Sequence, residues 1–111
     1  MNRLEFKKDK YRKARGGYSR FLKVSCERCG HFLALYQKDG PGPLKRMYLD
    51  RIFAPGTLVN LKELPLKKIP PLRCQNCKQV IGLPFLYKKE ERHSFRLFEG
   101  SVSKKIVKVI R

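Results

Sequence analysis

The sequence predicts a small domain that is all-β or β-rich, with two β-hairpins joined at a four-cysteine site and a basic N-terminal arm. Three observations support this fold class. All four cysteines of the 111 residues occur in two Cys-x-x-Cys pairs. Short apolar segments alternate with turns rich in glycine, proline or charge, as is typical of antiparallel strands. The first twenty residues are strongly basic and lack a convincing apolar stripe.

Composition separates an N-terminal arm, residues 1–20, from a β-rich domain, residues 21–111. The arm contains eight Lys and Arg, two acidic residues and a Gly-Gly pair. Charge runs with few apolar residues often stay solvated and flexible. We expect a flexible arm whose basic residues contact a polyanion, with a short helix over about residues 3–15 or a solvated tail as the alternatives.

Strands are predicted on both sides of the first cysteine pair. Residues 21–25 and 31–36 are apolar with partial alternation, and the turn residues 39–43 indicate that the chain then reverses. Residues 44–53 predict a returning strand, with a short helix as the alternative because some apolar residues in this segment also have helical spacing. The result is a hairpin built on the cysteine pair.

Proline governs the middle of the chain. Residues 58–61 predict a short strand, after which three prolines keep residues 62–72 extended and irregular, because proline cannot donate a hydrogen bond to a sheet. This segment is expected to connect the first hairpin with the second cysteine pair.

The C-terminal third predicts further strands. Residues 79–87 are apolar but are interrupted by a glycine and a proline, which indicates a bend or bulge. A charged turn, residues 88–92, leads into the alternating segment 93–98. Residues 102–110 are rich in β-branched residues and favour a strand, with a closing helix as the alternative.

The two cysteine pairs predict one closed metal site. Each Cys-x-x-Cys turn directs two sulfurs toward one point, and two such turns supply the four soft ligands of a tetrahedral structural zinc ion. The predicted Zn²⁺ ligands are Cys26, Cys29, Cys74 and Cys77. Paired disulfides and a redox-active pair are the alternatives. Disulfides are typical of secreted chains, and the redox motif accompanies a βαβ pattern that this sequence lacks.

The positions of the cysteine pairs lead to two further expectations. Forty-four residues, 30 to 73, separate Cys29 from Cys74, so a metal ion would join two distant parts of the chain and stabilise the whole domain. Gly30 suits the left-handed backbone that the residue after the second cysteine often adopts. Lys78 occupies the matching position of the second pair and does not suit it, which predicts that the two turns differ in shape.

The charge balance indicates a polyanionic partner. The chain has 27 Lys and Arg against nine Asp and Glu, a formal net charge of +18, and these basic residues are spread along its whole length. Such a charge opposes compaction unless a polyanion compensates it. The candidate nucleic-acid-binding residues are Lys7, Lys8, Lys10, Arg12, Lys13, Arg15, Arg20, Lys45, Arg46, Arg51, Lys67, Lys68, Lys104 and Lys105.

The sequence predicts neither an enzyme nor a membrane or secreted protein. Four cysteines close the metal shell, whereas catalytic zinc keeps an open position, and the carboxylates form no recognisable acid–base pair. His31, two residues after Cys29, is interpreted as a strand residue or phosphate donor rather than a ligand. No apolar run of membrane-spanning length and no signal region is present, so we expect a cytoplasmic protein without a small-molecule substrate.

With its four cysteines, Gly30 and β-rich flanks, the chain resembles the zinc-ribbon class of small basic proteins. That resemblance implies two hairpins with one cysteine turn each, and a role like those of ribosomal proteins, transcription factors or proteins that handle tRNA and rRNA. The sequence shows no long basic recognition helix, which favours structured RNA over DNA. We therefore expect an RNA-binding ribosomal or ribosome-associated protein that also contacts ribosomal proteins. The alternatives are a DNA-binding or polymerase-associated zinc ribbon and an enzyme acting on nucleic acid.

Overall fold

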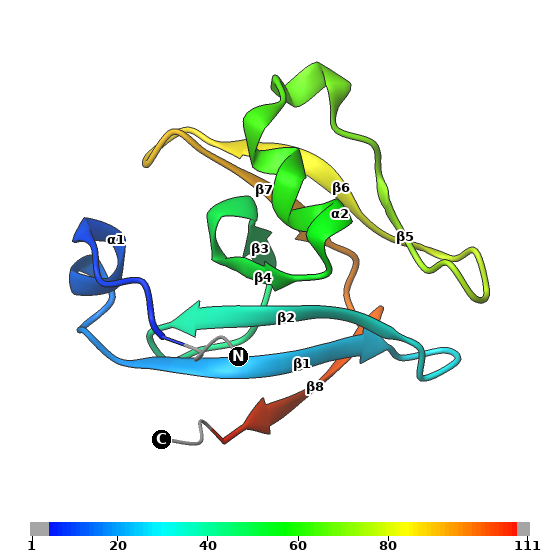
Figure 1. Cartoon of the computed structure of the whole chain (residues 1–111), viewed down its shortest axis with the longest axis horizontal. Helices are drawn as coiled ribbons and strands as arrows, with labels where there is room; N and C mark the ends of the chain where they lie inside the picture. The colour runs from blue at the N-terminus through cyan, green and yellow to red at the C-terminus, as the bar shows by residue number, and fades with distance from the viewer. Residues whose placement is uncertain (1–4, 109–111) are drawn as a thin grey trace.

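The first two strands, β1 (Ser19–Cys26) and β2 (Phe32–Asp39), pair as an antiparallel hairpin, and both bury apolar residues. β4 (Ile52–Ala54) pairs with the other side of β2, and β8 (Val102–Val107) pairs with the other side of β1. These four strands form sheet A in the order β4–β2–β1–β8 (Figure 1). The computed structural model describes residues 5–108.

Sheet B draws most of its strands from the second half of the chain. β5 (Leu72–Arg73), β6 (Val80–Tyr87) and β7 (Arg92–Leu97) pair in sequence order. β3 (Arg46–Tyr48) comes from the first half and pairs with β7, so the strand order is β3–β7–β6–β5. Every strand pair in this sheet is antiparallel.

The hydrophobic core lies between the two sheets. It is built from the inward-facing residues of the strands, because alternate residues of a strand share one face. Almost fully buried members of this core are Leu22, Val24, Tyr36, Met47, Ile81 and Phe95.

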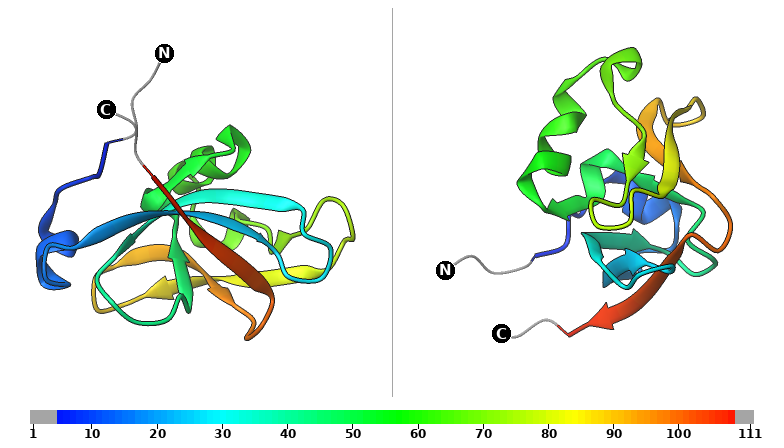
Figure 2. Two further views of the ribbon diagram at one scale, coloured as in Figure 1. Left: turned by 90° about the horizontal axis from the view of Figure 1, so that it is seen from below. Right: turned by 90° about the vertical axis from the view of Figure 1, so that its right-hand side faces the viewer.

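One short helix precedes β1, and further short helical turns occupy connections between later strands. They are α1 (Lys10–Ala14), α2 (Gly56–Val59) and the 3₁₀ turns η1 (Leu49–Arg51), η2 (Asn60–Glu63) and η3 (Leu66–Lys68). The connector from α2 to η3 lies on the side of the molecule away from β8 (Figure 2). Within residues 5–108, no helix is long and apolar enough to span a membrane.

The structure confirms the β-rich fold and the two hairpins at the cysteine pairs. The first pair lies in the β1–β2 turn and the second in the β5–β6 turn, and both turns lie at the same end of the molecule (Figure 1). The C-terminal segment forms the strand β8 rather than the alternative helix. Residues 109 and 110 of that predicted strand lie outside the described residues.

The returning strand predicted for residues 44–53 is wrong, because this segment divides into β3, η1 and β4. β3 belongs to sheet B and β4 to sheet A, so the chain crosses between the sheets here. Met47, Tyr48 and Leu49 are all buried. A strand with one buried face buries only alternate residues, and the crossing explains why consecutive ones are buried in this segment.

The short strand predicted for residues 58–61 is also wrong, since this segment is helical in α2 and η2. Leu58 and Leu61 lie three positions apart, and both pack against the core. Residues at this spacing share one face of a helical turn but lie on opposite faces of a strand.

The irregularity predicted in residues 79–87 occurs in the pairing of β5 with β6. The register shifts between Leu72 and Arg73, which leaves one extra residue on β6. A Cβ atom on Gly82 would lie 2.8 Å from the carbonyl oxygen of Arg96. Glycine is therefore needed at this position because β7 approaches β6 closely.

Residues 5–20 pack against sheet A, although their composition predicted a flexible arm. The ring of Phe6 stacks on that of Phe21, with 4.5 Å between centroids. The backbone of Lys7 exchanges two hydrogen bonds with the side chain of Gln37, at 2.7 and 3.0 Å. These contacts anchor the segment, and β1 already begins within it. The division of the chain at residue 20 stays a prediction.

Candidate metal centre and basic surface

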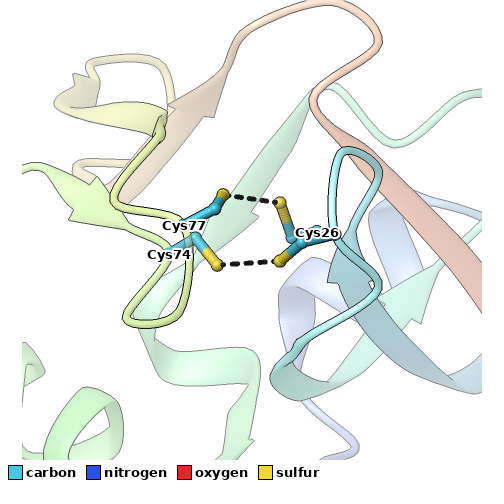
Figure 3. A group of neighbouring side chains, drawn as sticks. Cys26, Cys74 and Cys77 are labelled. Atoms are coloured by element: carbon cyan, nitrogen blue, oxygen red, sulfur yellow. Dashed lines mark hydrogen bonds between the residues drawn. The ribbon is translucent and has the colours of Figure 1, made fainter.

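Two turns from different sheets bring the four cysteine sulfurs together (Figure 3). Cys26 ends β1 and Cys29 lies in the β1–β2 turn, whereas Cys74 and Cys77 lie in the β5–β6 turn. The four Sγ atoms all lie within 4.8 Å of one another. The sulfur of Cys26 lies 3.7 Å from that of Cys77. The sulfurs of Cys29 and Cys74 lie 3.5 Å apart.

These separations fit a tetrahedral metal ion. Four Zn–S bonds of about 2.3 Å place the sulfurs about 3.8 Å apart, close to the two separations between the turns. A disulfide requires about 2.05 Å between its sulfurs, and all four cysteines are free thiols. The cluster is therefore a candidate metal site whose ligands come from both sheets.

The two cysteine turns have the same backbone shape, so the predicted difference between them is wrong. Gly30 donates its N–H to the carbonyl oxygen of Cys26 at 2.7 Å, and Lys78 donates to that of Cys74 at 2.8 Å. Both donors have a left-handed backbone, with φ of +80° for Gly30 and +66° for Lys78. The hydrogen bond that closes the turn thus imposes this conformation even on a residue with a Cβ atom.

The metal site is enclosed on one side and open to solvent on the other. Cys26 and Cys74 are fully buried, whereas Cys29 is exposed. Hydrogen bonds from the side chain of Asn76, and then from the backbone N–H of His31, lower the pKa of Cys29 to about 6. A thiol with this pKa is mostly thiolate at neutral pH, which is the form that binds metal.

The candidate metal cluster contains only cysteines within the described residues. His31 is exposed in the β1–β2 turn, and its backbone carbonyl accepts a hydrogen bond from the N–H of Cys26 at 2.8 Å. His31 therefore contributes to the turn through its backbone, and it lies just before β2 rather than in the predicted strand.

Arg51, a predicted nucleic-acid-binding residue, is instead a buried structural cation. Its side chain is 1% exposed, and its Nε donates to Asp39 at 2.8 Å. Its two terminal nitrogens donate to both carboxylate oxygens of Asp9, at 2.6 and 3.0 Å. Asp39 also accepts hydrogen bonds from Ser19 and Gln37. The prediction for Arg51 is wrong, because a guanidinium held between two carboxylates inside the fold cannot reach a phosphate.

A second ion cluster centres on Arg92, which the sequence analysis did not single out. Its guanidinium donates to both carboxylate oxygens of Asp50, at 2.7 and 3.2 Å, and to Glu90 at 3.0 Å. The rings of Tyr11 and Tyr48 lie 4.1 and 3.8 Å from this guanidinium. No local sequence signal marks Arg92, because apart from Glu90 its partners come from two distant segments, around Tyr11 and around residues 48–50.

Three further predicted basic residues are also held by internal contacts. Arg15 forms a bidentate salt bridge with Glu90, with both distances 2.9 Å. The ammonium of Lys7 donates to the backbone carbonyl of Asp50 at 2.6 Å. Arg12 donates to a serine hydroxyl on β1 at 2.9 Å. These side chains are positioned by the fold rather than free on the surface.

The remaining predicted basic residues lie at or near the surface. Arg20 and Arg46 are half-buried. The exposed ones are Lys8, Lys10, Lys13, Lys45, Lys67, Lys68, Lys104 and Lys105. They are distributed over the N-terminal segment, the connectors and β8, so the structure does not gather them into one patch.

Two hollows flank the segment 43–46. Lys38 lines the first, of about 370 Å³. Arg96, Phe98 and Lys104 line the second, of about 580 Å³. The sequence analysis missed Lys38 and Arg96, because nothing local distinguishes them from other basic residues. Their positions depend on how the two sheets meet.

Compared with known proteins, the chain matches no family model, no curated protein and no solved structure. The fold and the cysteine cluster define its class: a small β-rich domain of two antiparallel sheets with a four-cysteine candidate metal site.

Proposed function

We propose that this protein binds structured RNA as a ribosomal or ribosome-associated component, with a zinc ion as a structural element. The observation that carries the proposal is the separation of charge between the interior and the surface. The salt bridges of the described residues join Asp9, Asp39, Asp50 and Glu90 to Arg15, Arg51 and Arg92.

These salt bridges use a much larger share of the acidic residues than of the basic residues. They use four of the nine acidic residues and three of the 27 basic residues. Five acidic and 24 basic residues remain outside them. Neutral protein surfaces mix the two signs. So large an excess of positive charge outside the ion clusters supports a polyanionic partner that would compensate it.

The secondary structure favours folded RNA as that polyanion. The longest α-helix of the described residues, α1, has five residues, which is too short to read a DNA major groove in the way that recognition helices do. Basic side chains on strands, turns and connectors suit the phosphates of a structured RNA that surrounds the protein on several sides.

In this proposal the metal is Zn²⁺ and its role is structural. Four thiolates would fill the tetrahedral shell and leave no open position for a substrate. The protein acts by binding rather than by catalysis, with RNA and neighbouring ribosomal proteins as its partners and no small-molecule substrate. Reduced thiols suit a cytoplasmic location.

The affinity of the zinc-loaded protein for a structured RNA should fall steeply with salt. If about six phosphates are neutralised, log affinity should fall with log salt concentration with a slope of about −5. Fluorescence anisotropy titrations at several salt concentrations measure this slope. A duplex DNA of equal length is the comparison. A slope near zero, or equal affinity for the DNA, would contradict the proposal.

A further inference from the structure

Two basic residues face each other directly across β1 and β2. Arg20 on β1 lies opposite Lys38 on β2, so their side chains share one face of sheet A. Lys104 on β8 lies opposite Val24, which belongs to the same face because it is an even number of residues from Arg20. Like charges in directly opposed positions destabilise a sheet. This arrangement is unfavourable unless something compensates it.

Lys38 is a buried charge without an acidic partner. Its side chain lines the 370 Å³ hollow, and the residue is only 6% exposed. Its ammonium donates to the backbone carbonyls of Gly40 at 3.0 Å and Pro41 at 3.4 Å. Within residues 5–108, no carboxylate lies within salt-bridge distance of it. A buried ammonium that only neutral groups solvate is costly.

The surroundings of Lys38 are positive. Burial lowers the pKa of Lys38, and nearby cations lower it further. Those cations are Arg20, Lys104 and Arg15. Asp39 also lines the hollow, but its two carboxylate oxygens are occupied by Ser19, Gln37 and Arg51. The hollow therefore has a surplus of positive charge.

Arg20 provides a second group without a partner. Its Nε is buried, and the Nε–H donates to no acceptor among the described residues. Its guanidinium lies 5.5 Å from the ring of Tyr18, which leaves the N–H groups for another acceptor. Buried donors without an acceptor are rare in folded proteins and call for an explanation, such as a missing ion.

We propose that a phosphate group binds in this hollow at Lys38, with Arg20, opposite Lys38 in the sheet, and Lys104, on the same face of β8, as further donors beside the hollow. The inference rests on the proposed function, in which the phosphate belongs to RNA. A carboxylate would neutralise one cation, whereas a phosphate carries more charge and more acceptor oxygens and can satisfy two or three donors at once. The phosphate is either an internal phosphodiester or a terminal phosphate.

Inorganic phosphate tests the hollow without RNA. At a tenfold excess over its dissociation constant and at constant ionic strength, phosphate should raise the thermal midpoint of the zinc-loaded full-length protein by roughly 5 °C. Lys38→Met should lose this shift. Without phosphate, Lys38→Met should melt above the wild type, because it removes the buried unpaired charge.

Two neighbouring residues of β8 provide a matched comparison. Lys104 lines the second hollow and lies on the face of sheet A that carries Arg20 and Lys38, whereas Lys105 lies opposite Lys23 on the other face. Both are exposed, so substitution by methionine leaves the packing intact. Lys104→Met should reduce the phosphate-dependent shift, and Lys105→Met should retain it. Equal shifts in the two variants, or no shift in the wild type, would overturn the proposal.

RNA oligonucleotides with and without a 5′-phosphate identify the source of the phosphate. Lys38→Met should bind RNA about tenfold more weakly than Lys105→Met. Loss of a preference for phosphorylated RNA indicates a terminal phosphate, and equal weakening for both oligonucleotides indicates an internal one. If wild-type protein binds phosphate but not RNA, the proposed function fails while the phosphate site stands. If the two variants bind RNA equally well, the claim that the hollow binds a phosphate of RNA is overturned.

Discussion

Lys78 adopts a left-handed backbone although it carries a Cβ atom. Its φ of +66° costs a non-glycine residue about 1 kcal/mol, and the hydrogen bond from its N–H to Cys74 helps to hold it there. The side chain is exposed, and its ammonium donates to the carbonyl oxygen of Gln75 at 2.8 Å. The strain therefore comes from the cysteine turn and not from a packing role of the side chain.

Lys78→Gly should stabilise the zinc-loaded protein by about 0.5–1 kcal/mol, because glycine adopts a positive φ without steric strain. Gly30→Ala is the matched change in the other turn. No atom lies within 4 Å of the added Cβ, so only the backbone strain should appear, as a destabilisation of similar size. Urea unfolding midpoints measure both changes. A loss of stability in Lys78→Gly would show that the lysine side chain stabilises the turn.

At the scale of an element, the N-terminal segment, residues 5–20, divides its charges between the interior and the surface. Asp9 pairs with the buried Arg51, and Arg15 pairs with Glu90. Its exposed lysines are Lys8, Lys10 and Lys13. Deleting the segment would therefore remove internal partners of the fold together with phosphate-binding candidates, and point substitutions are needed to separate the two roles.

Asp9→Asn should reduce stability at neutral pH by about 1 kcal/mol, a value discounted because Asp9 is partly exposed. The hydrogen bond from Arg51 lowers the pKa of Asp9 from 3.8 to about 2. Since the folded pKa is the lower one, the contribution of Asp9 is present above about pH 4 and is lost as the pH falls toward 2. Thermal midpoints should therefore converge for the wild type and the variant between pH 5 and pH 2.

The triple substitution of Lys8, Lys10 and Lys13 by serine is the counterpart of Asp9→Asn. It should weaken RNA binding and flatten the salt slope, because it removes exposed cations, while the free energy of unfolding stays within about 0.5 kcal/mol of the wild type. A large loss of stability in the triple variant would show that these lysines stabilise the fold.

At the scale of the whole molecule, the cysteine cluster joins the tips of two hairpins that belong to different sheets. It lies at one end of the molecule, and α1 lies at the other (Figure 1). Structural zinc sites contribute on the order of 10 kcal/mol, comparable with the total stability of a small domain. Metal binding should therefore decide whether the two sheets stay together.

Elemental analysis should find one zinc ion per chain, and a chelator should abolish the cooperative thermal transition. Circular dichroism follows the loss of β structure, and adding zinc back to the reduced protein should restore it. Cys26→Ser, which removes a fully buried ligand, should have the same effect as the chelator. A chain that stays folded without metal and forms two disulfides would contradict this role.

The sequence by itself determined the candidate metal ligands, the strands beside the cysteine turns, the irregularity of β6 in its pairing with β5 and the excess of positive charge. Each of these depends on residues close together in the chain, such as Cys26 and Cys29, or on composition alone. The β-branched residues near the C-terminus also predicted β8, since such residues favour an extended chain.

Only the tertiary structure decided which charges are internal and where residues 44–53 belong. Arg51 meets Asp9 across 42 residues, and Arg15 meets Glu90 across 75 residues. No local pattern records such a pair, because burial of a charge depends on a partner brought from a distant segment when the sheets pack. For the same physical reason, Lys38 looks like any surface lysine in the sequence and becomes a buried, unpaired cation only in the folded chain.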